Sequence, residues 1–398
     1  MRYLTFLLFY FPLITNVLNV QGFISKFVSE SFSQIFAYLN VVFLMLGILL
    51  IMRESQKFAV LVKLWIVFYL VYYTFALLAN IHLDTQVPLL RTLVPITYFL
   101  AFSFLLSKPE FLKPIGKTLA ISFFLTCILL IVLDYFNFSM DYSGIYEYEL
   151  ERAGGVYGDA NNASVAAILS FIFLKHFIQP KNNFEKVIKI ITLLISTYGI
   201  LITFSKTGFV AFLIVLAVTY HKLFSPKRMI LSLVFVPISF LLLINWALTS
   251  DKLSFGQKQR VDSLINILTL NTSQVGLSDR DVLFQNMLNH IFERPLLGNG
   301  VNFSNIIRGH NTIFGIWADA GILTFLIFLL LLFLYFKKAF NSPNSTKYFA
   351  LSVLLTLTIF MLTLQTIINQ GYLMVVFVLL GYMTCNYNSD NLNKIVQF

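Results

Sequence analysis

The sequence predicts an all-α polytopic membrane protein, with about twelve transmembrane helices in one integral membrane domain over residues 1–398. Of the 398 residues, 58% are hydrophobic and only 12% are charged, and the mean hydropathy is +0.81. A typical soluble domain carries about 25% charged residues. Apolar runs long enough to cross a hydrocarbon core of about 30 Å recur along the whole chain. These observations exclude an ordinary soluble domain.

Short polar segments separate the apolar runs. The first run has no clear cleavage site after it, which indicates a retained helix rather than a signal peptide. The eighth and the last run are short for a membrane-crossing helix. We expect helices near residues 3–20, 33–52, 58–80, 89–107, 118–136, 161–178, 187–204, 209–220, 229–248, 312–336, 348–367 and 371–386.

Lysine and arginine set the predicted orientation, because loops that stay in the cytoplasm are enriched in both. With the amino terminus in the cytoplasm, most of the 28 basic residues fall in inner loops. Most acidic residues then fall in outer loops, and both termini are cytoplasmic. The net charge of +10 therefore follows membrane topology, and we expect no nucleic acid partner.

Two outer loops stand out, over residues 137–160 and 249–311. The second is far longer than the usual connection of about 2–8 residues between bundled helices, so we expect a functional loop. Its apolar residues recur at helical spacing and predict a short amphipathic helix, which either packs on the helix bundle or lies at the outer interface. These residues are Val261, Leu264, Ile265 and Leu268.

A second helix is predicted further along the same loop. Ser278 to Asp281 form a capping-box pattern, and Pro295 ends the helix. Arg280 then lies in the first turn, where backbone N–H groups favour an anion and a guanidinium adds a bidentate phosphate ligand. The alternative is that Arg280 only pairs with neighbouring acids.

His310 and Asn311 open the apolar span that follows this loop. Asn311 is a favourable N-cap residue. If the helix extends back to His310, then His310, Gly321 and Thr324 lie near one helix face, and Gly321 allows another helix to approach. The alternative is an ordinary interfacial histidine. The competing hypothesis is that His310 has a chemical role. It is favoured by Arg308, two residues earlier, and by Arg280 in the same loop.

Four segments resemble the O-antigen ligase/polymerase superfamily of bacterial envelope glycan enzymes. The resemblance covers roughly residues 150–335. Three positions depart from the family pattern: Ala160 replaces a proline, Lys206 an arginine and Asp279 a glycine. The matching segments are Arg152 to Ala163 (RAGGVYGDANNA, with Asn161), Ser205 to Gly208 (SKTG), Ser278 to Arg280 followed by Pro295 to Gly300 (PLLGNG), and His310-Asn311 with Gly321 and Thr324.

The resemblance implies a glycosyltransferase of the bacterial inner (plasma) membrane. Its donor would be a glycan linked to polyprenyl diphosphate, and its acceptor another lipid-linked glycan or lipid A-core. It implies His310 and Arg280 as catalytic residues, with His310 activating the acceptor hydroxyl and Arg280 holding the diphosphate. Arg152, Lys206 and Arg308 would also bind the donor. A chain-length regulator is a further expected partner.

We expect neither a cofactor nor a metal ion. The two cysteines, Cys127 and Cys385, form no metal-ligand pattern, and the sequence contains no nucleotide-binding motif.

Three hypotheses remain open. A polymerase of surface polysaccharide repeat units is favoured, and a ligase that transfers the glycan to lipid A-core is the alternative within the same class. A polysaccharide-lipid flippase or transporter belongs to another class. Most charged residues of the predicted spans lie at the span ends, and the exceptions are Lys63, Arg91, Asp134 and Asp319. So few charges in the middle of the membrane argue against ion-coupled transport.

Overall fold

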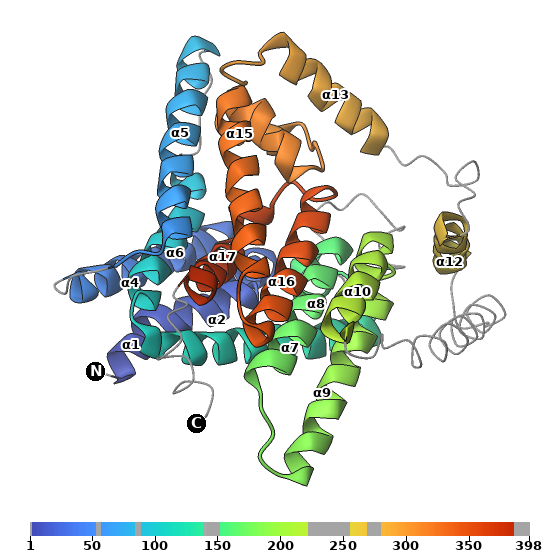
Figure 1. The fold of residues 1–398 in the computed structure, drawn as a ribbon. Helices are drawn as coiled ribbons and strands as arrows, with labels where there is room; N and C mark the ends of the chain where they lie inside the picture. Colours follow the sequence, from blue (N-terminus) through green and yellow to red (C-terminus); the bar gives the residue numbers. More distant parts are fainter. Residues whose placement is uncertain are drawn as a thin grey trace.

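The computed structural model describes residues 2–52, 57–83, 89–138, 140, 152–221, 255–268 and 280–385, and every regular element in these ranges is a helix. Most are α-helices (Figure 1). These are α1 (Arg2–Thr5), α2 (Phe11–Val17), α3 (Val20–Phe27), α4 (Glu30–Ile51), α5 (Val60–Leu83), α6 (Leu89–Leu106), α7 (Leu112–Tyr135), α8 (Ala160–Phe177), α9 (Asn183–Ile202), α10 (Lys206–Thr219), α12 (Phe255–Leu268), α13 (Arg280–Glu293), α14 (Phe303–Ile306), α15 (Thr312–Phe340), α16 (Asn344–Met361) and α17 (Gly371–Cys385). The others are a π-helical turn, η1 (Phe6–Tyr10), and the 3₁₀ turns η2 (Pro109–Phe111), η4 (Gly155–Tyr157) and η7 (Ile367–Asn369).

Helices occupy every predicted position except 229–248, which lies outside the described residues. Among the described residues, four helical stretches are long and apolar enough to cross a membrane: Glu30–Ile51, Val60–Ile81, Pro109–Tyr135 and Thr312–Phe340. The segments Tyr3–Val17 and Val20–Phe27 are bent by 64° and add a fifth if they count as one span. The part of the chain that the structure describes therefore contains four or five helices that could cross a membrane, and the twelve expected spans are not confirmed.

The remaining apolar helices depart from the prediction in length or polarity. α10 and α17 are apolar but have fewer than 18 residues. α8, α9 and α16 carry polar or charged residues in their first turns, such as Asn161, Glu185 and Lys347. The first predicted span is not one straight helix, because Asn19 adopts left-handed backbone angles (φ 48°) between α2 and α3.

α17 lies at the centre of the helices around it and packs against α5 and α6 (Figure 1). Each of its residues from Gly371 to Leu380 is buried. A helix that is apolar all round is expected to be enclosed in this way. By contrast, α4 exposes an apolar stripe at a spacing of three and four residues, as a lipid-facing helix does. The stripe consists of Ile35, Leu39, Val42, Leu46 and Leu49.

α7 packs along α8, α5 along α15, and α10 along α16. α13 lies across the end of α15, whereas α12 stands apart from the other helices (Figure 1). α13 packs through Met287 and Ile291 against Ala318 of α15.

Candidate functional site

The amino end of α8 brings two of the motif segments together. Asp159 caps the helix by accepting a hydrogen bond from the backbone N–H of Asn162 at 2.8 Å. This cap places Asn161 in the first turn, where it is 3% exposed. Asn161 Oδ1 accepts hydrogen bonds from Arg152 Nη2 at 3.3 Å and from Ser205 Oγ at 2.8 Å. One amide oxygen thus joins Arg152 to the segment that begins at Ser205.

The amino end of α10 lies beside that joint. Ser205 caps α10 by accepting a hydrogen bond from Gly208 N at 3.0 Å, and Lys206 is the first residue of the helix. A Cβ atom at Gly208 would lie 1.9 Å from Ser164 Oγ of α8, so only glycine fits this contact. The amino ends of two helices, each with a positive dipole end, therefore meet next to Arg152.

The Arg152 segment is also attached to the end of α9. Arg152 Nε donates to Thr203 O at 3.3 Å, and Ala153 N donates to Ile202 O at 3.3 Å. The guanidinium is thereby held from two directions. Two buried polar atoms in the first turns of α8 have no hydrogen-bond partner among the described residues, Asn161 Nδ2 and Ser164 Oγ.

The turn η4 connects this region to the bent amino-terminal helices. Tyr157 Oη donates to Val17 O at 2.6 Å, and Asn19 Nδ2 donates to Val156 O at 2.7 Å. Burial raises the pKa of the Tyr157 phenol well above its ordinary value, so the hydroxyl stays a neutral donor.

The PLLGNG segment folds onto a break in α15. The break lies at Ala320 and Gly321, where Gly321 has φ 76°. It frees the carbonyls of Ala318 and Asp319, which accept hydrogen bonds from Asn299 N at 2.8 Å and Gly300 N at 3.0 Å. A Cβ atom at Gly321 would lie 1.8 Å from Leu296 O. Gly321 is therefore needed for the break and for close backbone contact.

This break corrects the prediction that His310, Gly321 and Thr324 share one helix face. His310 precedes the helix and has φ 47°, and Asn311 caps α15 by accepting from Phe314 N at 3.0 Å. The helical path is then interrupted before Thr324, whose Oγ1 donates to Ala320 O at 2.9 Å. Gly321 contacts the backbone of the preceding loop rather than another membrane helix.

The loop before α15 has an unusual backbone. Asn302, Arg308 and His310 all have positive φ angles, of 60°, 53° and 47°. Left-handed backbone angles cost a non-glycine residue on the order of 1 kcal/mol, and asparagine bears them best. Arg308 is exposed and His310 is half-buried. Such conformations persist only where surrounding contacts hold them, which suggests a loop of fixed shape.

The linker between α16 and α17 joins the motif segments, and the sequence interpretation missed it. Gln365 Oε1 accepts from His310 N at 2.9 Å, and Asn369 Nδ2 donates to Asn302 Oδ1 at 3.1 Å. Gln370 Nε2 donates to Asn162 Oδ1 at 2.9 Å. The linker therefore connects the His310 segment with the amino end of α8. Its only sequence signal is three amide side chains between two apolar runs.

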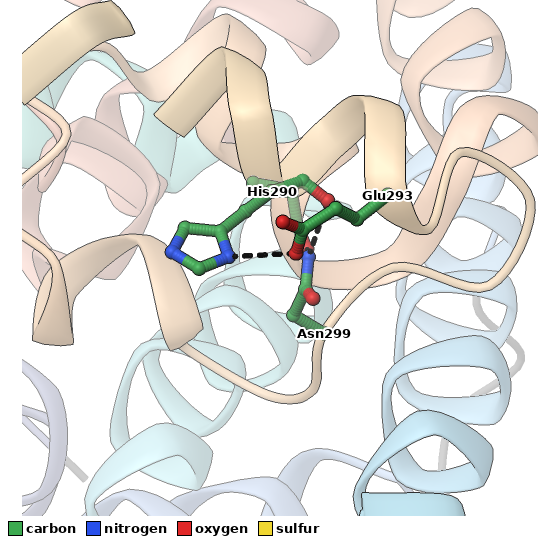
Figure 2. A network of polar contacts seen from close by, with 4 residues as sticks. His290, Glu293 and Asn299 are labelled. Atoms are coloured by element: carbon green, nitrogen blue, oxygen red, sulfur yellow. Dashed lines mark hydrogen bonds and ion pairs between the residues drawn. The ribbon is translucent and has the colours of Figure 1, made fainter. Parts of the chain in front are cut away.

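Arg280 is the first residue of α13, and its side chain lies outside what the structure describes. The other end of α13 is tied to the PLLGNG segment, as Figure 2 shows. His290 Nδ1 lies 3.4 Å from Glu293 Oε2, and Asn299 Nδ2 donates to His290 O at 3.2 Å and to Ala318 O at 3.0 Å. Asn299 thereby links α13 to α15.

The structure thus joins Arg152, Asn161, Ser205 and Lys206 at one place, and links His310 to the same end of the helices through the α16–α17 linker. Arg308 is exposed on the loop between them. Comparison with models of known protein families finds no match to this chain, and comparison with curated proteins also finds none.

Proposed function

We propose that this protein is a membrane glycosyltransferase that polymerises polysaccharide repeat units from a polyprenyl-diphosphate-linked donor. The resemblance of four sequence segments to the O-antigen ligase/polymerase superfamily suggests this reaction. The proposal places the reaction at the outer face of the bacterial inner membrane, where the charge distribution puts these segments. The same distribution puts both termini in the cytoplasm.

The observation that carries the proposal is the joint at Asn161. Arg152, Asn161, Ser205 and Lys206 come from two separate motif segments, and they meet where the amino ends of α8 and α10 converge. Two helix dipoles, a guanidinium and an ammonium group favour an anion. The buried Asn161 Nδ2 is a further donor without a protein partner among the described residues. A diphosphate suits this donor set.

The proposed reaction is a displacement at the anomeric carbon of the donor. The acceptor hydroxyl oxygen forms a bond to that carbon, and the bond from the carbon to the diphosphate oxygen breaks. The hydroxyl proton passes to His310, which suits a base near neutral pH. The polyprenyl diphosphate leaves with the bonding electron pair, and positive charge from Arg152, Lys206 and Arg280 stabilises it.

The arrangement of the polar linker supports a shared site. Gln365 holds the backbone of His310, and Gln370 holds Asn162 beside the Arg152 joint. Four residues separate Gln365 from Gln370 in the chain, so one short linker connects the two halves of the proposed site. Arg308 lies on the loop between them and would contact the donor from the exposed side.

The test uses His310→Ala, Arg280→Ala and Arg152→Ala in cells that lack the native gene, with membrane expression measured for each. Lys186→Ala is the control, because Lys186 is exposed on α9 away from these contacts. We expect all three variants to lose long-chain glycan and the control to retain it. Wild-type glycan length and amount from both His310→Ala and Arg280→Ala would contradict the assignment.

The same experiment separates the competing functions. Loss of a polymerase leaves acceptors that carry a single repeat unit. Loss of a ligase leaves bare lipid A-core, with polymer still attached to the polyprenyl carrier. Loss of a flippase traps unpolymerised lipid-linked units on the cytoplasmic side.

A further inference from the structure

Asp319 is a buried carboxylate of α15 that none of the proposed chemical steps uses. It is 5% exposed and lies one residue before the helix break. Its Oδ2 accepts from Tyr72 Oη of α5 at 2.8 Å and from Ser304 Oγ at 3.3 Å. Its Oδ1 accepts from Ser304 N at 2.6 Å. Burying a carboxylate is costly, so these donors are needed to keep it there.

α5 and α15 hold the backbone of the turn over residues 300–304. Gly300 N donates to Asp319 O at 3.0 Å, and Val301 N donates to Asn80 Oδ1 at 2.7 Å. Asn302 N donates to Tyr72 Oη at 3.2 Å. With the Ser304 bond, four backbone N–H groups of this turn are fixed to one pair of helices. We call this set of contacts the Asp319 clamp.

The clamp is connected to His310 through backbone atoms. Ser304, whose N–H is held by Asp319, accepts from Gly309 N at 3.0 Å through its own carbonyl. Gly309 precedes His310, whose backbone N–H is held by Gln365. A Cβ atom at Gly309 would lie 2.5 Å from Met287 Sδ, so the side chain of Met287 on α13 lies close to the backbone of Gly309. A shift of Ser304 would therefore move Gly309 and His310 together.

The intrinsic backbone preferences of its residues do not explain the shape of the loop before α15. Arg308 and His310 both hold left-handed backbone angles, which non-glycine residues adopt only under external constraint. The Asp319 clamp on one side and Gln365 on the other supply such constraints.

We propose that Asp319 and Tyr72 are positioning residues that fix the His310 loop in the geometry used for acceptor activation. This inference rests on the proposed function for its chemical meaning. The clamp itself is a property of the loop and is measurable without any substrate.

Tyr72→Phe and Asp319→Asn test the clamp. The first removes only the hydroxyl that serves both Asp319 and Asn302, and the second removes the negative charge. Tyr73→Phe is the matched control, because Tyr73 is the next residue of α5 and its hydroxyl donates to Thr92 O instead. Ser304→Ala, which removes only the Oγ contact, is a milder variant if the others do not fold.

Two measurements are made on each purified full-length variant. Amide hydrogen exchange is followed in the peptide that carries residues 305–311. Turnover is measured with a short polyprenyl-diphosphate oligosaccharide as both donor and acceptor. We expect exchange at least about tenfold faster in Tyr72→Phe, and kcat at least about tenfold lower with an unchanged KM for the donor. Tyr73→Phe should match wild type in both.

The outcomes separate the two proposals. Unchanged exchange in Tyr72→Phe and Asp319→Asn overturns the clamp, whatever the activity. Faster exchange with an unchanged kcat overturns its role in positioning His310. If the variants exchange faster but the wild-type protein shows no turnover, the proposed function is refuted and the clamp is retained. A rise in KM alone assigns the loss to donor binding and overturns the positioning role.

Discussion

Arg152 donates a hydrogen bond to the side-chain oxygen of Asn161 at 3.3 Å, across nine residues of the chain. Ser205 donates to the same oxygen. The amide of Asn161 therefore aligns the arginine with the amino end of α10 and leaves its own NH₂ group without a partner among the described residues. The orientation of Arg152 depends on a neutral side chain as much as on its own charge.

Asn161→Ala should separate the two motif segments. It removes the acceptor shared by Arg152 and Ser205 and leaves the buried Ser205 hydroxyl without this acceptor, which costs about 1–3 kcal/mol of unfolding free energy. We expect a lower thermal midpoint and loss of long-chain glycan. Asn183→Ala, at the exposed start of α9, is the control and should change neither. Full glycan synthesis by Asn161→Ala would show that the joint is not part of the site.

Arg152→Lys should fail although it keeps the charge. The guanidinium donates at once to Thr203 O and Asn161 Oδ1, and an ammonium group at the end of a flexible chain does not reproduce this planar fork. We expect at least about a tenfold loss of turnover, which corresponds to about 1.4 kcal/mol. Lys206→Arg should instead retain activity. Equal activity of Arg152→Lys and wild type would show that position 152 requires only a positive charge.

Gly321→Ala should strongly destabilise the protein. The new Cβ atom would lie 1.8 Å from Leu296 O at a positive φ angle, so the α15 break or the PLLGNG segment must move. We expect a loss of at least about 3 kcal/mol. Gly199→Ala is the matched control, because Gly199 lies inside α9 and the added Cβ would meet Cys127 Cβ of α7 at 3.6 Å, an ordinary van der Waals distance. It should be neutral or stabilising by up to about 1 kcal/mol in thermal unfolding.

Tyr335→Phe should affect stability and leave catalysis unchanged. Tyr335 Oη accepts from Trp65 Nε1 at 3.0 Å and donates to Phe377 O at 2.9 Å, far from the motif segments in the core of the helices. Removing it leaves a buried indole donor unpaired, at a cost of about 1–3 kcal/mol. Tyr198→Phe, at an exposed site on α9, is the control for thermal unfolding. A change in kcat at a temperature where Tyr335→Phe is folded would contradict this prediction.

Local signals in the sequence predicted much of the helical structure. Apolar length was sufficient for α4, α5, α7 and the start of α15, because each of these signals lies within its own segment. The proline at 295 likewise marked the end of α13, which stops at Glu293. The structure of a segment can therefore be predicted from the sequence where the segment's own residues determine it.

The break in α15 could not be predicted from the sequence, because the groups that stabilise it come from a different segment of the chain. The sequence predicts an uninterrupted helix over Trp317 to Leu323, and the break there is stabilised by N–H groups of Asn299 and Gly300. The linker over 365–370 was missed for the same reason, since its partners lie as far away as Asn162. The motif residues could be named from sequence, whereas the amides that connect them could not.

The enclosure of α17 has a consequence for biogenesis. Its residues are synthesised after those of α2, α5, α6, α7, α15 and α16, all of which surround it. Until α17 is synthesised, the surfaces of the earlier helices that it covers stay unpaired. These apolar and aromatic surfaces would then face the translocation machinery or lipid. Assembly of the core is thus completed late, and the waiting intermediate is a natural substrate for membrane chaperones and quality-control proteases.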